Sequence, residues 1–365
     1  MKEQDHNRPR SGNNPSEGRR TFLQTLAGLT TSIMVPISCR SKAERAATSK
    51  APTELASFED TAVLAPVRDR LGELLPQRKL GKTGETVTML GLGGAHIARM
   101  SESEAQKTIE TSLEGGVRFF DNAEQYGNGL AEKRYGMFLS PDYRDVSYIM
   151  TKTRATNAKV AQQHLEDSLR RMNTDYIDLW QIHSVTSPND VDRRLENGVL
   201  EFVQQAQAEG KIRHYGFTGH RDYQAHQRML EQAGDVMQTC QMPINVFDPN
   251  YKSFINNVLP KLIEQDIAPL AMKTLANGGF FGGTSHFNSG DKPRIVPNAL
   301  SVQEAIHFVW SLPVSVLITG PDHAEMMQEK IDLARSFTAY SEDDRQALVE
   351  RVANFDGNSV EYYKA

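Results

Sequence analysis

The sequence predicts an α/β protein built as a closed (β/α)8 barrel, the TIM-barrel fold. From residue 89 onward, eight short β-rich segments alternate with helical patterns, which indicates a parallel sheet whose strands are joined by helices. The eight units fill about 250 residues, the usual length of such a barrel. An open doubly wound sheet normally has a G-x-G-x-x-G turn after its first strand, and this chain has none. The short glycine-rich stretch at 91–94 lacks the third glycine at the required offset.

The elements follow in order along the chain. Residues 78–88 favour a small hairpin that plugs the bottom of the barrel. The strands are expected at 89–93, 117–123, 146–153, 176–183, 212–219, 236–243, 268–275 and 314–320. Helices are expected at 160–172, from apolar residues at helical spacing, and at 198–208, which ends before Gly210, a residue suited to a left-handed C-cap.

Additional C-terminal helices are expected after the last strand, at 323–337 and 341–355. The tail after Phe355 is short and polar, and it gives no sign of a long loop that narrows the barrel mouth. The chain therefore divides into a signal segment (1–42), a linker or N-terminal extension (43–77), the barrel (78–340), and a C-terminal helix and tail (341–365).

Residues 1–42 are interpreted as a twin-arginine signal peptide. Arg19 and Arg20 follow a polar stretch, and a modestly apolar run comes directly after them. The alternative is a disordered tail with a chance arginine pair. The run contains too much Thr, Gln and Gly for a stable membrane span. Lipid anchoring at Cys39 is the less favoured option, because Pro36 stands where a branched aliphatic residue is expected. This interpretation predicts the twin-arginine export machinery as a partner and an exported, periplasmic location.

Composition excludes several other classes of protein. The net charge is −5 and no basic tract runs through the body of the chain, so a nucleic-acid partner is not expected. The two cysteines, Cys39 and Cys240, are too few for a disulfide framework, a Cys-rich zinc site or a cysteine-ligated cluster. No H-x-H or H-E-x-x-H pair falls at a strand end, so a metal-dependent barrel hydrolase has no support.

Ionisable residues end three consecutive predicted strands: Asp121, Lys152 and His183. Tyr126 follows Asp121 in the next loop. Each residue alone has an ordinary explanation as a turn cap, a packed ring, a solvated strand end or a core histidine. Three apolar strands that finish with a charge or an imidazole at the same end cost desolvation without any gain in packing. Because these ends meet at the mouth of a barrel, we predict that the four residues form one site.

With these residues in view, the sequence resembles the aldo-keto reductase family over about residues 78–337. The resemblance is carried by D-x4-Y at Asp121 and Tyr126, a lysine after a β-rich run, L-x-x-S-L-x-R-x-x-x-D-Y-I-D-L at 165–179, and the strand-ending histidine. It implies an NAD(P)(H)-dependent oxidoreductase that interconverts a carbonyl and an alcohol, the carbonyl being an aldehyde, a ketone or sugar-like. The implied catalytic tetrad is Asp121, Tyr126, Lys152 and His183.

The chemistry of reduction suits these residue types. Hydride addition leaves an alkoxide that must be protonated, and tyrosine, with a pKa of about 10, is a poor donor at neutral pH. The Lys152 ammonium is expected to lower the pKa of Tyr126, while Asp121 keeps the lysine charged. Tyr126 then acts as general acid in reduction and as base in oxidation, and His183 donates to the carbonyl oxygen and orients it.

The same resemblance implies NADP(H) as cofactor, with NAD(H) as the alternative. Gln241 is expected to bond the nicotinamide amide, and the glycine-rich stretch 276–283 resembles the segment that folds over the pyrophosphate, although a plain flexible connection is the alternative. Asp322, Met326 and Lys330 stand where members selective for the 2′-phosphate place Ser, Arg or Gln, and Asn, and a carboxylate suits a ribose hydroxyl better. The residues assigned to the cofactor are Gly93, Gly94, Asp121, Thr218, Gly219, Gln241, Met272, Lys273, Thr274, Leu275, Gly320, Asp322, Glu329 and Lys330.

Two further expectations concern substrate and cofactor use. The loops at 184–194 and 245–254 are expected to line the mouth, with Phe247, Asp248 and Tyr251 in contact with a polyhydroxylated ligand. Because twin-arginine export moves folded proteins, the cofactor is expected to be loaded before export and retained. The competing function is a redox-sensing or auxiliary barrel that holds the nucleotide with negligible turnover, since the fold alone does not decide activity.

Overall fold

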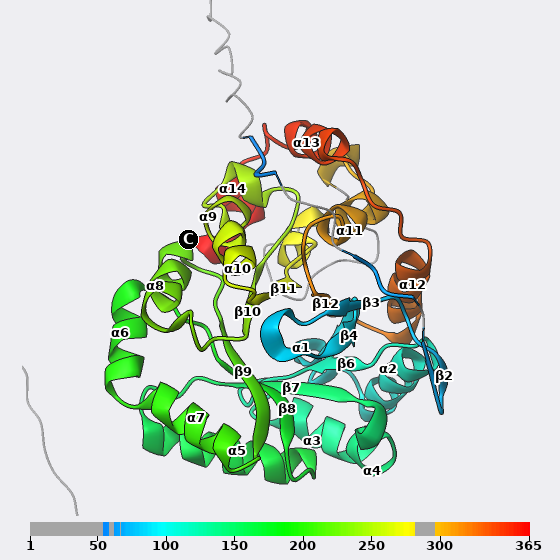
Figure 1. The fold of residues 1–365 in the computed structure, drawn as a ribbon. Helices are drawn as coiled ribbons and strands as arrows, with labels where there is room; N and C mark the ends of the chain where they lie inside the picture. The colour runs from blue at the N-terminus through cyan, green and yellow to red at the C-terminus, as the bar shows by residue number, and fades with distance from the viewer. Residues whose placement is uncertain (1–53, 58–61, 66, 282–295) are drawn as a thin grey trace, which may run out of the picture. The chain divides into compact units, whose positions relative to one another are not determined.

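The computed structural model describes residues 54–57, 62–65, 67–281 and 296–365. The predicted signal segment, with Arg19, Arg20 and Cys39, lies outside the described residues. Eight parallel strands close into a barrel whose neighbours follow chain order, which confirms the predicted (β/α)8 fold (Figure 1). The strands are β5 (Leu90–Gly93), β6 (Phe119–Asp121), β7 (Tyr148–Thr153), β8 (Ile177–Ile182), β9 (Ile212–Thr218), β10 (Thr239–Pro243), β11 (Ala268–Met272) and β12 (Val316–Thr319).

Helices surround this barrel. They are α1 (Gly94–Ile97), α2 (Glu102–Glu114), α3 (Leu130–Phe138), α4 (Ser140–Tyr143), α5 (Ala158–Met172), α6 (Pro188–Glu196), α7 (Val199–Ala208), α8 (Tyr223–Ala233), α9 (Phe254–Asn257), α10 (Leu259–Glu264), α11 (Val302–Trp310), α12 (Ala324–Arg335), α13 (Glu342–Arg351) and α14 (Gly357–Val360). Asn157 begins α5 by accepting a hydrogen bond from the backbone N–H of Val160 at 3.0 Å. Gly210 follows α7 with a φ of +75°, as its predicted capping role requires.

One strand boundary differs from the prediction in a way that matters for the site. The expected strand at 268–275 ends at Met272. Lys273 has a φ of +58°, a left-handed conformation that breaks extended backbone. Lys273, Thr274 and Leu275 therefore belong to the loop that leaves the barrel mouth.

The predicted hairpin is formed by β3 (Gln77–Lys79) and β4 (Thr86–Thr88), which pair antiparallel. Leu80 and Val87 are buried in one apolar cluster with side chains from the barrel interior, among them Phe119 at the start of β6. The buried guanidinium of Arg78 donates to the carbonyl oxygens of Trp310 at 2.5 Å and Val314 at 2.6 Å, where α11 ends. A cation suits the end of a helix, so these contacts hold the plug against the amino-terminal end of the barrel.

Part of the segment expected as a linker packs on the barrel. It forms a second short hairpin from β1 (Arg68–Asp69) and β2 (Gly72–Glu73). The Arg118 guanidinium donates to both oxygens of Asp69, at 2.6 and 2.9 Å, and thereby fastens this hairpin to the start of β6.

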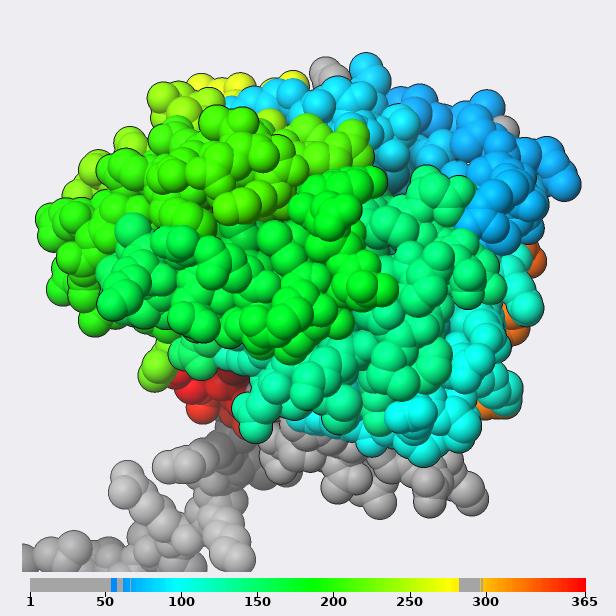
Figure 2. All heavy atoms as spheres, turned by 90° about the horizontal axis from the view of Figure 1, so that it is seen from below, coloured from blue at the N-terminus to red at the C-terminus, as the bar shows by residue number. Residues whose placement is uncertain are grey.

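The C-terminal tail lies at the other end of the barrel. After α13, the chain forms α14 and a 3-10 turn at Tyr362–Lys364, and Glu361 and Lys364 are fully buried. In Figure 2 the blue hairpins and the red last residues occupy opposite edges of the barrel. The tail is short, as expected, and its last residues bind to the loops that follow β10 and β11, through Lys364 on Asp248 and Tyr362 on Asn277.

Candidate active site

The four predicted catalytic residues meet at the carboxyl ends of β6, β7 and β8. Asp121 is the last residue of β6, Lys152 is the last but one of β7, and His183 directly follows β8. Lys152 Nζ forms a buried ion pair with Asp121 Oδ1 and donates to the backbone oxygen of Asn122 at 2.6 Å. The same amine lies 3.5 Å from Tyr126 Oη. The structure thus brings carboxylate, ammonium and phenol into one contact network.

His183 completes the cluster. Its ring meets the half-buried Tyr126 ring edge-on, with centroids 6.0 Å apart and planes at 86°. The backbone on each side is fixed: His183 N–H donates to Thr153 O at 2.7 Å, and Arg194 donates to His183 O at 2.9 Å. His183 Nδ1 is buried and has no hydrogen-bond partner among the described residues. The imidazole is therefore held in place with a polar atom still unsatisfied.

Burial and charge set the protonation states of this cluster. Burial lowers the pKa of Lys152, but the attraction and hydrogen bonds of Asp121 and Tyr126 together outweigh it, so the net pKa of Lys152 is raised. Burial also raises the pKa of Asp121, against the pull of Lys152. The pKa of His183 falls well below 6.5, first through burial and then through repulsion by Lys152, so its ring is neutral at pH 7.

The expected acidification of Tyr126 is not what the structure shows. Lys152 does pull the pKa of Tyr126 down, but burial of the phenol pushes it up by more. The net pKa therefore lies above the ordinary value of 10.0. The expected lowering of this pKa is therefore wrong, because the cost of desolvating the phenolate exceeds the stabilisation by the neighbouring ammonium.

Predicted cofactor residues from β5, β9 and β10 border the cluster. Gly93 pairs with Asp121 in the sheet register, and a Cβ on Gly94 would lie 2.7 Å from Asp121 O. Gly219 N–H donates to Gln241 O at 3.2 Å, and Thr218 lies opposite Gln241 in the register. Only glycine fits at Gly94, so the strand ends can approach one another closely at this side of the mouth.

Several polar atoms at the mouth are buried without a partner. Asn122 Nδ2, Gln241 Oε1 and Thr274 Oγ1 have no hydrogen-bond partner among the described residues. The Gln241 side chain lies near the Asp121 carboxylate and helps to lower the pKa of Asp121. A buried donor or acceptor without a partner costs free energy. A ligand that carries both donors and acceptors, such as the carboxamide of a nicotinamide, would satisfy these three atoms.

The residues assigned to the adenosine end are spread over β12 and α12. Asp322 lies in the loop after β12 and bonds His96 Nδ1 at 2.8 Å. A Cβ on Gly320 would lie 2.5 Å from a carbon of the same His96 ring. On α12, Glu329 is exposed and Lys330 is buried, with a pKa lowered by that burial. His96 therefore joins the ends of β5 and β12.

Sequence reasoning missed Asn122 and His96. Asn122 directly follows Asp121 at the end of its strand, but a criterion based on ionisable side chains passes over an amide; a criterion of polar strand ends includes it. His96 lies three residues after Gly93 in α1, a position that the strand-end rule does not reach.

The loop after β10 does not present all the residues expected to contact substrate. Asp248 is fully buried, and its carboxylate accepts hydrogen bonds from the backbone of Phe254 and Ile255 and from Lys364. Phe247 is buried as well, with its ring edge-on to Phe280. Asp248 is a structural residue of this loop, and its predicted contact with a ligand is wrong.

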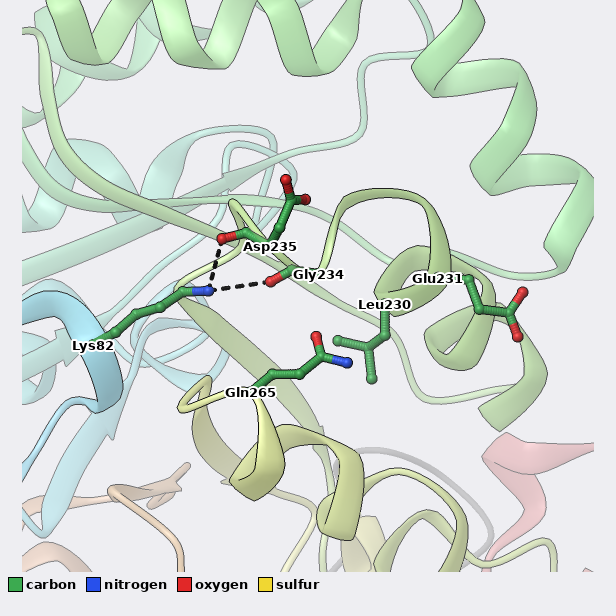
Figure 3. A pocket seen from close by; sticks show the side chains of 6 residues that line it. All are labelled: Lys82, Leu230, Glu231, Gly234, Asp235 and Gln265. Carbon is green, nitrogen blue, oxygen red and sulfur yellow. Dashed lines mark hydrogen bonds between the residues drawn. The ribbon is translucent and has the colours of Figure 1, made fainter.

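A separate cavity of about 430 Å³ lies near the opposite, amino-terminal end of the barrel (Figure 3). Its lining residues are Lys82, Leu230, Glu231, Gly234, Asp235 and Gln265. Lys82, from the turn of the plug hairpin, donates to the carbonyl oxygens of Gly234 at 3.1 Å and Asp235 at 2.9 Å, next to the end of α8 (Figure 3). This amine serves as a helix cap and has no contact with the tetrad.

The described part of the chain contains no group of three or more His, Cys, Asp or Glu side chains placed to hold a metal ion. None of its helices combines the length and the apolar character needed to cross a membrane.

Known proteins resemble this chain in sequence and fold. The model of the Aldo/keto reductase family matches residues 89–338. The uncharacterized oxidoreductase YcsN of Bacillus subtilis is 30% identical over 226 residues, which cover 56% of this chain and 71% of that protein. The holo form of the aldo-keto reductase AKR11C1 from Bacillus halodurans has a TM-score of 0.63 at 21% identity, over 75% of this chain and 95% of its own.

A second solved structure is an aldo-keto reductase from Klebsiella pneumoniae in complex with NADPH. Its TM-score is 0.59 at 21% identity, over 73% of this chain and 92% of that chain. At this identity the two structures establish the fold, and the family model, which spans the barrel, establishes the family. The chain belongs to the aldo/keto reductase family and is an oxidoreductase of that type.

Proposed function

We propose that this enzyme interconverts a carbonyl, which is an aldehyde, a ketone or sugar-like, and the corresponding alcohol, with NADP(H) as cofactor. The observation that carries the proposal is the Lys152 amine, which bonds the Asp121 carboxylate and lies 3.5 Å from the Tyr126 hydroxyl. His183 lies edge-on to the same phenol ring. The phenol supplies the proton donor, the ammonium stabilises the phenolate that remains, and the imidazole orients the carbonyl oxygen.

The nucleotide, when bound, supplies hydride to the carbonyl or accepts it from the alcohol. Asn122 Nδ2, Gln241 Oε1 and Thr274 Oγ1 are the unsatisfied buried atoms that would hold it. The NADPH found in the Klebsiella pneumoniae relative supports NADP(H). Asp322 favours a ribose hydroxyl over a phosphate, so NAD(H) is the alternative, and affinities measured for both nucleotides decide between them.

Tyr126 moves the proton in this mechanism. Its raised pKa keeps the phenol protonated at neutral pH, as a general acid for reduction must be. When the proton passes to the alkoxide, the Lys152 ammonium stabilises the phenolate that remains, and Asp121 keeps that ammonium charged and in place. The neutral His183 ring orients the substrate oxygen beside the phenol.

The test is Tyr126→Phe. We expect kcat to fall by about 10²- to 10⁴-fold, because the general acid is lost. Nucleotide Kd should stay within about two-fold, since the ring remains. Tyr148→Phe is the matched control: this buried hydroxyl has no hydrogen-bond partner among the described residues, and it lies at the start of β7. A Tyr126→Phe enzyme with wild-type turnover would contradict the proposal.

The competing function, a nucleotide-holding barrel with negligible turnover, is tested by the same preparation. A wild-type chain that binds nucleotide but reduces no member of a panel of aldehydes, ketones and sugars would favour it over the enzyme.

We propose further that the protein is exported by the twin-arginine machinery to the periplasm, with its nucleotide already bound. Support comes from the sequence: Arg19 and Arg20 directly precede a modestly apolar run. Lipid anchoring at Cys39 is the less favoured form of this proposal.

A further inference from the structure

The last residues of the chain are fixed to the barrel mouth by a buried ionic network. Lys364 Nζ lies 2.6 Å from Asp248 Oδ1 and 2.8 Å from Glu361 Oε2, and it donates to Tyr251 O at 2.9 Å. All three charged side chains are fully buried. Buried charges persist when they are paired and fully hydrogen-bonded, so this network holds residues 361–364, called here the C-terminal anchor, on the loop after β10.

The C-terminal anchor also holds the ring of Tyr363. The Tyr363 hydroxyl donates to Glu361 Oε1 at 2.7 Å. Asn245, two residues after β10, donates through Nδ2 to Glu361 Oε1 at 2.8 Å and to the Tyr363 hydroxyl at 3.1 Å. Tyr363 is only 6% exposed and its hydroxyl has two hydrogen-bond partners, so its ring is held in one orientation.

The ring of Tyr363 lies against a residue of the predicted cofactor segment. Lys273 Nζ is 4.9 Å from the ring centroid, within the range of a cation–π contact. Asn245 Nδ2 also donates to Lys273 O at 3.4 Å, so the residue that bonds Glu361 and Tyr363 contacts the backbone of Lys273 as well. Next along the segment, Asn277 Nδ2 donates to the Tyr362 hydroxyl at 2.8 Å.

Lys273 has the position and charge expected of a residue that binds an anionic ligand. It directly follows β11 at the mouth, in a left-handed conformation that turns the chain out of the strand. Burial lowers its pKa to about 8, and no neighbouring carboxylate among the described residues offsets that shift. A lysine side chain is flexible, and holding it in one place before the ligand arrives reduces the entropy lost on binding.

We propose that Tyr363 is a positioning residue for the nicotinamide nucleotide: its ring, fixed by the C-terminal anchor, holds the Lys273 ammonium where it binds the phosphate groups. This inference rests on the proposed function, because it assumes that a nicotinamide nucleotide binds at this mouth. The last residues of the chain would thus contribute to cofactor affinity, whereas the tetrad transfers the proton.

The experiment measures Kd and the dissociation rate of NADP⁺ and NADPH for the purified full chain. Tyr363→Leu removes the ring, and we expect Kd to rise about three- to thirty-fold, the range of a cation–π contact. Tyr363→Phe keeps the ring but loses the hydroxyl bonds that fix it, so its Kd should rise by less than that of Tyr363→Leu. In turnover, Tyr363→Leu should raise KM for the nucleotide while kcat stays within about two-fold.

A double-mutant cycle separates positioning from simple loss of structure. Lys273→Met leaves the anchor in place and removes the cation, so it should weaken binding at least as much as Tyr363→Leu. If the ring acts through this cation, the double variant binds as Lys273→Met does, whereas independent effects would multiply. Multiplied effects, or wild-type affinity in Tyr363→Leu, would overturn the inference.

The inference and the proposed function fail in different ways. A wild-type chain that binds neither NADP(H) nor NAD(H) contradicts the cofactor itself, and with it the inference. A wild-type chain that binds nucleotide, with Tyr363→Leu unchanged, contradicts only the role of Tyr363.

Discussion

The Tyr126 hydroxyl lies 3.5 Å from the Lys152 amine, yet burial raises its pKa above 10.0. The free chain therefore holds a phenol that is protonated throughout the neutral range. Reduction needs the protonated form and oxidation needs the phenolate, so one pKa controls both directions with opposite sign. The neutral His183 contributes no charge change between pH 6 and 8, since its pKa lies well below 6.5.

We expect this pKa to be visible in pH profiles of kcat/KM. The value for carbonyl reduction should be flat from about pH 6 to 9, and that for alcohol oxidation should rise across the same interval. Lys152→Met removes the ammonium that lowers the pKa of Tyr126, so the oxidation profile of its residual activity should move to higher pH. A shift to lower pH, or a break near 6.5 in wild-type reduction, would contradict these assignments.

At the scale of elements, the plug hairpin and the catalytic mouth lie at opposite ends of the barrel, so stability and activity can be changed separately. Leu80 is fully buried in the cluster that joins the hairpin to the barrel interior. Its contacts reach the start of β6, whereas Asp121 ends that strand. A loss of packing at Leu80 should therefore leave the tetrad geometry intact.

We expect Leu80→Ala to lower the free energy of unfolding by about 2–5 kcal/mol, the cost of a cavity at a buried leucine. Denaturant unfolding measures this, and kcat/KM at a temperature where the variant is folded should be unchanged. Ile263→Ala is the control, because Ile263 is 45% exposed on α10 and its change should stay within about 0.5 kcal/mol. Equal effects of the two substitutions would show that the hairpin adds no packing to the barrel.

The sequence predicts those elements whose signals are local. Strand positions, the hairpin and the cluster of Asp121, Lys152 and His183 follow from patterns within about ten residues and from the rule that strand ends of a barrel converge. The end of β11 was misplaced, because Lys273 leaves the strand through a backbone conformation that its residue type does not signal. The C-terminal anchor was missed because Lys364 pairs with Asp248, 116 residues away, and a polar composition alone suggests an exposed tail.

At the scale of the whole molecule, the mouth is assembled from distant parts of the chain. The proposed tetrad comes from β6 to β8 and the loops after them. The unsatisfied polar atoms proposed to hold the cofactor come from the residue after β6, from β10 and from the loop after β11, and the anchor comes from the last residues. The proposed nucleotide site is therefore complete only after the last residues have folded onto the mouth. Since the twin-arginine machinery exports folded proteins, this assembly fits the proposal that the nucleotide is bound before export.

The export proposal is tested by changing the arginine pair while keeping its charge. Arg19→Lys together with Arg20→Lys should leave the protein in the cytoplasmic fraction, whereas the wild type is recovered from the periplasm. Arg8→Lys with Arg10→Lys is the matched control, since these two arginines lie outside the pair and their substitution should not affect export. Nucleotide released from the exported wild type by denaturation should approach one per chain. Unchanged export of the first variant, or an exported chain without nucleotide, would contradict the corresponding part of the proposal.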